Sequence, residues 1–152
     1  MIIAFAGHRS ERLGDDLAGA WIAIKEFLMT ERPDGVISGM AQGVDSMAFD
    51  IAVDLGIPVT AAVPWVGHAL EWPPTLREQY LARLEKAADV RVTSDVDRYS
   101  VSVYSIRNRW MVDNSDRLAA VWDGVRDGGT WDAIEYSRKL KREPTFLKWR
   151  AK

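Results

Sequence analysis

Short apolar runs alternate along the chain with segments whose apolar residues recur at every third or fourth position. The runs are too short for helices and are rich in Val, Ile and Ala, which is typical of strands buried on both faces of a sheet. They cover, in chain order, residues 2–6, 36–37, 58–63, 90–93 and 118–122. The alternation predicts an α/β fold: a single Rossmann-like domain over residues 1–152, with a mostly parallel sheet and helices on both of its faces.

The periodic segments predict the helices. One helix is expected to carry its apolar face at Leu13, Leu17, Trp21, Ile24 and Leu28, with Trp21 in the core. Further helices are expected, in order, over residues 44–55, 76–84, 106–113 and 129–140, followed by an edge strand over residues 145–149. The polar stretch over residues 94–102 is expected to be a loop.

The composition fits a folded globule and excludes several other classes. A chain of 152 residues, 47% of them hydrophobic, can bury one core and is not disordered. It has no cysteine, which excludes disulfides and thiolate zinc sites and fits a reducing compartment. The apolar start lacks a basic leader, and no apolar run is long enough to cross a bilayer. We therefore expect a cytoplasmic protein without membrane contact.

Charge is unevenly distributed along the chain. The net charge is −2, yet residues 138–152 hold seven Lys or Arg against a single Glu. A basic tail can contact nucleic acid, whereas the acidic remainder disfavours a broad nucleic-acid footprint. The two histidines, His8 and His68, form no metal-ligating cluster in the sequence, so no metal site is predicted.

Turns that directly follow strands carry the candidate chemistry, because ligands of open α/β sheets bind beyond the carboxyl ends of the strands. The first turn offers a glycine for close backbone approach and an arginine for phosphate, in the order Gly7, His8, Arg9. The second could bind an anion through backbone amides at a helix start, and its candidate residues are Ser38, Gly39, Met40, Ala41, Gly43 and Asp45. Asp45 is either a helix cap or a contact for a sugar hydroxyl.

Two later segments complete the set. Arg107 and Asn108 lie on the expected helix over residues 106–113, where only one of Arg107 and Arg109 can face the cleft. The last candidate turn could present amides and a hydroxyl to phosphate, through Asp123, Gly124, Gly128, Gly129 and Thr130. Its aspartates, at positions 123 and 127, would repel an anion unless they point away or hold a Mg²⁺ ion that accompanies the phosphate.

These turns, together with Val63-Pro64-Trp65, resemble the superfamily that unites the Smf/DNA-processing A and Lonely Guy proteins (SLOG), and within it the YpsA-type branch. The matching pieces span nearly the whole chain in order. The resemblance implies a Rossmann-like fold with a nucleotide-binding cleft, and often a homodimer. Some relatives are phosphoribohydrolases, some bind single-stranded DNA, and others are sensor modules.

One departure from the resemblance concerns catalysis. The hydrolase branch has a glutamate three residues after the threonine of its glycine-rich turn, and here that position is Ala133. Base removal needs an acid or base within hydrogen-bond reach. The remaining candidates for such a carboxylate are Asp132, Glu135 and Glu71.

The sequence therefore supports a main hypothesis and two alternatives. The main one is a binding or sensing module for a nucleotide or a nucleotide-derived ligand, such as NAD, ADP-ribose or a nucleoside phosphate. The first alternative is an enzyme that hydrolyses or transfers at the N-glycosidic bond of nucleoside monophosphates. The second is binding of single-stranded DNA, for which the basic tail is the main motive.

Overall fold

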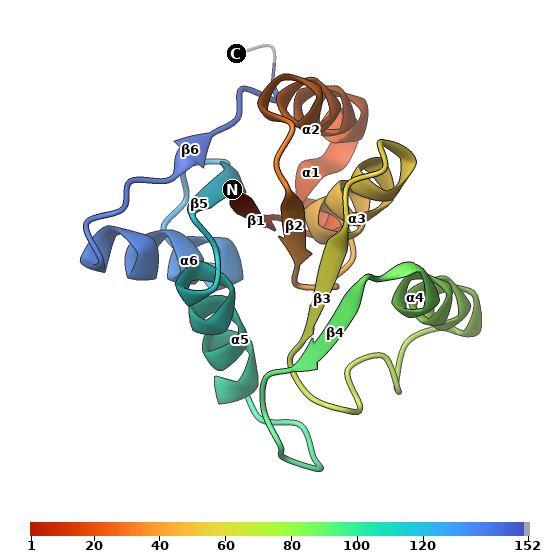
Figure 1. Ribbon diagram of the computed structural model, residues 1–152. Helices are drawn as coiled ribbons and strands as arrows, with labels where there is room; N and C mark the ends of the chain where they lie inside the picture. The colour runs from red at the N-terminus through yellow and green to blue at the C-terminus, as the bar shows by residue number, and fades with distance from the viewer. Residues whose placement is uncertain (151–152) are drawn as a thin grey trace.

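The computed structural model describes residues 1–150, which form one six-stranded parallel sheet with helices on both faces (Figure 1). Along the chain the elements are β1 (Ile2–Gly7), α1 (Ser10–Leu13), the short 3-10 helix Gly14–Asp16, α2 (Leu17–Glu31), β2 (Gly35–Ser38), α3 (Val44–Asp54), β3 (Val59–Val63), α4 (Pro74–Lys86), β4 (Asp89–Val92), α5 (Ser102–Asp113), β5 (Arg117–Val121), α6 (Gly128–Lys139) and β6 (Thr145–Phe146). The predicted fold class is confirmed.

The strand order is β4-β3-β2-β1-β5-β6. The chain builds outward from β1 to β4, then crosses back through α5 and adds β5 and β6 on the other side of β1. Strand order thus reverses between β1 and β5, which pair in register from Ile3 with Arg117 to Gly7 with Val121. Such a reversal separates the loops above two neighbouring strands and creates a crevice beyond their carboxyl ends.

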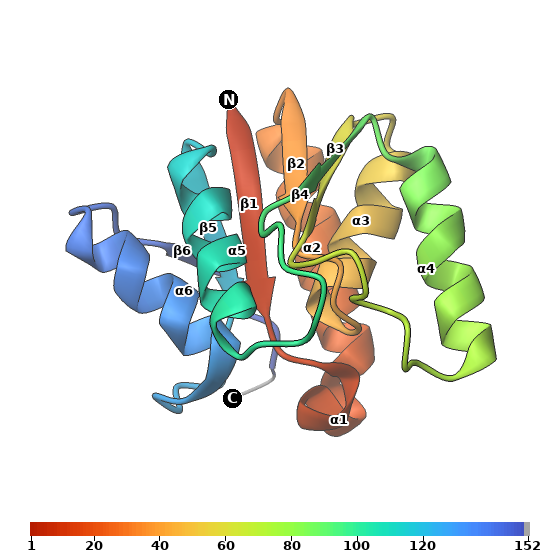
Figure 2. The ribbon, with the colours of Figure 1, turned by 90° about the horizontal axis from the view of Figure 1, so that it is seen from below.

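The two faces of the sheet are covered by different helices (Figure 2). Helices α2, α3 and α4 pack on one face, against large residues such as Ile3, Phe5 and Val36. Helices α5 and α6 lie on the other face, where the strands present Ala4, Ala6, Ile37, Ala62 and Leu118. The alternation of side chains along each strand therefore puts bulky residues on one side and mostly alanines on the other.

The first predicted helix is wrong in two respects. Instead of one helix from Leu13 to Leu28, the chain forms α1, a 3-10 turn and α2, and Gly14 ends α1 with a φ of 57°. Trp21 is 38% exposed, and Ala20 takes the buried position beside it. Leu17, also predicted on the apolar face, is 38% exposed, whereas Leu13, Ile24 and Leu28 are buried as predicted. The break after Leu13 interrupts the spacing on which the positions of Leu17 and Trp21 were predicted.

Smaller differences affect element ends. The edge strand covers only Thr145–Phe146, although the prediction extended it to residue 149, because Trp149 turns back to donate a hydrogen bond from its ring to the Trp122 carbonyl at 3.1 Å. Strand β5 ends at Val121, one residue before its predicted end. Within residues 1–150, none of the helices has both the length and the apolarity needed to span a bilayer.

Candidate functional site

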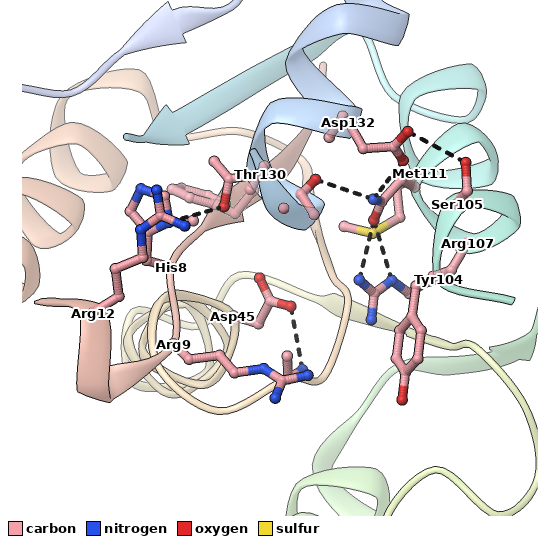
Figure 3. Close-up of a pocket in the computed structure, with 18 of the residues that line it drawn as sticks. His8, Arg9, Arg12, Asp45, Tyr104, Ser105, Arg107, Met111, Thr130 and Asp132 are labelled. Atoms are coloured by element: carbon pink, nitrogen blue, oxygen red, sulfur yellow. Dashed lines mark hydrogen bonds between the residues drawn. The ribbon is translucent and has the colours of Figure 1, made fainter. Parts of the chain in front are cut away.

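A cavity of about 750 Å³ opens beyond the carboxyl ends of β1 and β5, where strand order reverses. Its wall comes from the turn after β1, the turn after β2, α5 and the first turns of α6. Figure 3 shows His8 and Thr130 on one side of it, Tyr104 and Arg107 on the other, and Arg9 and Asp45 between them. Its volume lies in the range of small-molecule sites.

The first two turns interlock through their glycines. A Cβ at Gly7 would overlap the Val44 side chain, and a Cβ at Gly43 would overlap the carbonyl of His8 and the backbone of Arg9. Gly43 also has a φ of 96°, a conformation that disfavours other residues. The His8 carbonyl accepts a hydrogen bond from the Val44 amide at 3.1 Å. Both glycines therefore serve the packing of one turn on the other.

The turn after β2 pairs two of its own backbone amides with side chains of the same segment. The Met40 amide donates to Ser38 Oγ at 3.2 Å, and the Ala41 amide donates to Asp45 Oδ2 at 3.2 Å. Ser38 Oγ in turn donates to the Asp45 carbonyl at 2.9 Å. Amides that already have protein acceptors are poor anion ligands, so of the amides predicted to form a cradle, those of Met40 and Ala41 are not available to a ligand. Among residues 1–150, no protein acceptor takes the amides of Gly39, Gln42 or Gly43.

The first three backbone amides of α6 are unpaired. Among residues 1–150, no protein acceptor takes a hydrogen bond from the backbone amides of Gly128, Gly129 or Thr130. Asp127 occupies the cap position but makes no side-chain capping bond. All three residues line the cavity. Unpaired amides at the positive end of a helix, here one of twelve residues, are the groups that bind anions at helix N-termini in other proteins.

His8 fixes the hydroxyl of Thr130. Its Nε2 accepts a hydrogen bond from the Asp123 amide at 3.0 Å, and its Nδ1 lies 3.4 Å from Thr130 Oγ1. Burial lowers the pKa of His8, so the ring is neutral with its proton on Nδ1. Nδ1 then donates to Thr130 Oγ1, which leaves the hydroxyl proton of Thr130 for an acceptor in the cavity.

Arg12 neutralises the two aspartates that flank this helix start. Its guanidinium contacts Asp123 Oδ2 at 2.7 Å and Asp127 Oδ1 at 2.7 Å. The hydrogen bond to Arg12 and the charge of that group lower the pKa of Asp123 against the opposing effect of burial. Arg12 is thus the counter-charge of both aspartates for which the sequence analysis considered a Mg²⁺ role. Within residues 1–150, no group of three His, Cys, Asp or Glu side chains is arranged to hold a metal.

Arg107 and Asn108 connect α5 to the other walls. Arg107 is 7% exposed and donates to the Gly39 carbonyl at 2.9 Å and to Asn108 Oδ1 at 3.1 Å. Asn108 Nδ2 donates to Asp132 Oδ2 at 3.0 Å and to the Gly129 carbonyl at 3.2 Å. Arg109 lies on the exposed side, so one arginine of the pair faces the cavity, as the helical spacing predicted. The network positions the start of α6 relative to the turn after β2.

Asp45 is a buried carboxyl group in the cavity wall. Burial raises its pKa to about 6, although the positive charge of Arg107 and the hydrogen bond from Ala41 act in the opposite direction. A buried group with a pKa shifted toward neutrality, next to a buried cation in a cleft, is a frequent feature of functional sites. Protonation of Asp45 near neutral pH changes the charge that the wall presents to a ligand.

The structure brings together ten of the sixteen ligand-binding residues predicted from the sequence. Those that line the cavity are Gly7, His8, Arg9, Ala41, Asp45, Arg107, Asn108, Gly128, Gly129 and Thr130. Those that lie behind or beside it are Ser38, Gly39, Met40, Gly43, Asp123 and Gly124. Of the candidate catalytic carboxylates, Asp132 lines the cavity and is held by Asn108, whereas Glu135 and Glu71 lie outside its wall.

Several wall residues were missed by the sequence analysis. They are Phe5, Ala6, Glu11, Arg12, Tyr99, Val101, Tyr104, Ser105, Met111 and Leu118, with Ala133 also in the wall. The helical spacing offered one signal, since Tyr104 and Met111 lie three residues before and four after Arg107 and so share its face. No comparable signal marks Arg12, whose partners are 111 and more residues away.

The sequence matches no family model, and no curated protein is detectably similar to it. The fold is shared with solved structures. DNA processing protein A from Helicobacter pylori, studied for its single-stranded DNA binding mode, is 16% identical with a TM-score of 0.73, over 99% of this chain and 66% of that one. DNA processing protein A from Streptococcus pneumoniae is 16% identical with a TM-score of 0.73, over 95% of this chain and 49% of that one.

A molybdenum cofactor carrier protein from Chlamydomonas reinhardtii is also similar, at 18% identity and a TM-score of 0.62, over 95% of this chain and 74% of that one. The chain spans less than two thirds of each DNA processing protein A chain. At these identities the likeness shows a common fold.

Proposed function

We propose that this protein binds a nucleotide or a nucleotide-derived ligand, with a phosphate group at the start of α6. The observation that carries the proposal is the set of unpaired amides at Gly128, Gly129 and Thr130, which line a cavity large enough for such a ligand. The SLOG resemblance supports it, as does the fold shared with DNA processing protein A and the molybdenum cofactor carrier protein.

Three groups add to the amides. The Thr130 hydroxyl donates into the cavity because His8 Nδ1 occupies its lone pair. Arg9 lines the same cavity and has no ion-pair partner within residues 1–150. Arg12 holds both nearby aspartates. A phosphate would thus meet amide dipoles, a hydroxyl and a free guanidinium, with the adjacent carboxylates neutralised. The role that fits is a binding or sensing module.

A thermal-shift screen tests the proposal directly. The panel holds nucleoside mono-, di- and triphosphates, NAD, ADP-ribose and a short single-stranded DNA. A ligand at about one hundred times its Kd adds about 2.7 kcal/mol of stability, which raises the Tm of a domain of this size by about 5 to 10 °C. Stabilisation by at least one nucleotide class is expected, and a panel without any shift would contradict the proposal.

Gly129 allows a clean variant of the binding site. A Cβ at this position has its closest neighbour, Asn108 Nδ2, at 4.0 Å, and its φ is not positive, so larger residues fit the fold. Gly129→Val is expected to abolish the ligand-induced shift by crowding the amides, while the Tm without ligand stays within a few degrees. Gly129→Ala is the graded control and should retain part of the binding. Unchanged affinity in Gly129→Val would show that the phosphate lies elsewhere.

Binding of single-stranded DNA is the second candidate, favoured by the fold shared with DNA processing protein A. Part of the basic tail serves the fold: Arg138 pairs with Glu143, and Arg142 donates to the Val112 and Ser115 carbonyls. Lys139, Lys141 and Lys148 remain exposed. If DNA binds there, the affinity falls steeply with salt and Lys148→Glu weakens it several-fold. Salt-independent binding would exclude this mode.

A further inference from the structure

We propose that β4 pairs edge to edge with β4 of a second copy of this chain, in an antiparallel arrangement in which Val90 lies opposite Val90 of the other copy. The two six-stranded sheets then form one continuous sheet across the interface. The exposure of β4, its free backbone edge and its charge pattern carry the proposal, and none of them involves the candidate nucleotide site.

β4 is an open edge of the sheet. It pairs with β3 on one side, and within residues 1–150 no strand pairs with its other side (Figure 1). All four of its residues are exposed, including Val90 at 41% and Val92 at 47%. The opposite edge strand, β6, has only two residues, and very short edge strands resist pairing with another chain. β4 is therefore the edge at which a further strand can add.

The backbone of β4 offers hydrogen-bonding groups at this edge. Successive residues of a strand point their amide and carbonyl groups to opposite sides in turn. The amide of Thr93, directly after β4, donates to the Val63 carbonyl of β3 at 2.8 Å. The backbone groups of Val90 and Val92 therefore point away from β3. The Val90 amide agrees with this, because it donates to the Asp89 carboxylate at 2.9 Å.

The order of charges along β4 is complementary to itself. Asp89 and Arg91 lie two residues apart on one face of the strand, with side chains 51% and 62% exposed. With Val90 opposite its own copy, Asp89 of each chain lies directly opposite Arg91 of the other. Opposite charges at facing positions stabilise a strand pair, and like charges destabilise it.

Other registers lack these pairs. An antiparallel pair centred on Arg91 would place two arginines opposite each other. A pair centred on Val92 would place Arg91 opposite the uncharged Thr93. The charge pattern therefore selects a second copy as the partner and Val90 as the centre of the pair.

Pairing replaces contacts within one chain by equivalent contacts between two. In the single chain the Asp89 carboxylate accepts hydrogen bonds from the Val90 amide and from Arg91 Nε, each at 2.9 Å. In the dimer the Val90 carbonyl of the other copy accepts from that amide, which leaves Asp89 free for the facing Arg91. The interface is small, so we expect a weak dimer with a Kd of the order of tens of micromolar.

The two candidate sites stay open in this dimer. Antiparallel pairing makes the strands of the two copies run in opposite directions, so their carboxyl ends lie at opposite sides of the joint sheet. Each cavity lies beyond the carboxyl ends of β1 and β5, and β2 and β3 separate β1 from the interface. Association can therefore be measured without a ligand.

Sedimentation equilibrium with two complementary charge variants tests the pairing. Asp89→Arg gives an edge with two positive charges, and Arg91→Asp gives one with two negative charges. Each variant alone should associate at least about tenfold more weakly than the wild type, because like charges then face each other. An equimolar mixture should associate within about threefold of the wild type, because the facing charges are again opposite. Asp97→Arg, an exposed change in the loop after β4, should leave association unchanged.

Cysteine cross-linking tests the register. The chain has no cysteine, so each variant carries a single thiol. In the proposed register the two Cα atoms of residue 90 are about 5.5 Å apart, within reach of a disulfide. Those of residue 92 are about 14 Å apart, at about 3.4 Å per residue, which is beyond reach. Val90→Cys should therefore give a covalent dimer on mild oxidation, and Val92→Cys should not.

Three sedimentation results would overturn the proposal. They are a wild-type protein that stays monomeric at several hundred micromolar, charge variants that associate as the wild type does, and a mixture that associates no better than either variant alone. A covalent dimer of Val92→Cys without one of Val90→Cys would overturn the register. Thermal unfolding of each variant checks that lost association is not lost folding, and the cysteine variants keep the pairing testable if a charge variant fails to fold.

Discussion

The two faces of the sheet differ in how completely they are packed. The face under α2, α3 and α4 carries Ile3, Phe5, Val36 and Val59, and a continuous apolar cluster reaches from α2 to α4. The face under α5 and α6 carries alanines and contains the cavity. The same strands supply both faces, since neighbouring residues point to opposite sides. One face therefore holds the fold together, and the other leaves room for a ligand.

This difference shows how a small domain can combine stability with a binding site. A large cavity within a single core would remove contacts that a chain of this length needs. Here the cavity is confined to one layer, and the polar groups around it come from the ends of elements that the opposite core fixes. The contacts of the well-packed face thus compensate for the contacts that the face with small side chains lacks.

Truncation of one large side chain on each face should show the largest contrast. Phe49, on the inner side of α3, is fully buried, and Phe49→Ala should lower the free energy of unfolding by about 3 to 5 kcal/mol. Met111→Ala should cost about 2 kcal/mol, the low end for a buried methionine, because Met111 is 4% exposed but lines the cavity on one side. Urea titration of both variants measures this. Equal losses would mean that the two faces are packed alike.

The buried histidine His68, which packs between residues of α4 and α5, should make the stability of the protein sensitive to acid. His68 packs against Trp72 and Tyr80 on the α4 side and Tyr104 on α5, and burial lowers its pKa to about 3. Between pH 6.5 and 3 the unfolded chain binds a proton there that the folded protein excludes, so stability falls as pH falls. The slope for this group is up to about 1.4 kcal/mol per pH unit.

Urea titrations of the wild type and His68→Phe from pH 7 to pH 4 measure that slope. The variant loses this contribution, so its stability should depend less on pH, even though Tyr80 loses its hydroxyl partner. Asp45, with its raised pKa, acts in the opposite direction between pH 4 and 6 in both proteins, and comparison of the two cancels it. Parallel pH profiles would exclude His68 as the acid-sensitive group.

The smallest expected effect concerns binding. Asp45 lies on α3 but faces the cavity, and its carboxyl group ionises as pH rises through about 6. An anionic ligand should then bind less tightly to the wild type than to Asp45→Asn at pH 8, by about fivefold for about 1 kcal/mol of repulsion, and equally at pH 5. Titrations of one nucleotide at both pH values test this. Weaker binding to Asp45→Asn at both would instead indicate a contact with a sugar hydroxyl.

Much of the fold was predictable from local patterns. Short apolar runs marked the strands, and Gly56 and Pro58 marked the end of α3. The break after Leu13 was not predictable, because Leu13 and Leu17 kept the helical spacing across it. The exposure of Trp21 was not predicted for the same reason. The spacing of apolar residues indicates which side of a helix is buried, but not which residues lie at the margin of that side.

The candidate site was predictable where it depends on glycine-containing turns and not where it depends on partners distant in sequence. The start of α6 was expected to bind phosphate from Gly128, Gly129 and Thr130 alone. The pairing of the Ala41 amide with the Asp45 side chain depends on a turn geometry that the sequence position of Asp45 allowed but did not require. The pairing of Arg12 with Asp123 depends on the sheet order, which brings the ends of β1 and β5 together.

The interlocked turns at Gly7 and Gly43 affect how substitutions should accumulate in this protein. Each glycine touches the other turn, so neither can drift to another residue without a compensating change across the gap. Both should therefore persist in descendants of this chain that have lost all ligand binding, and their persistence says nothing about activity. Gly129 has room for a side chain and no strained φ. Its retention or loss is what would distinguish lineages that still use the cavity from those that keep only the fold.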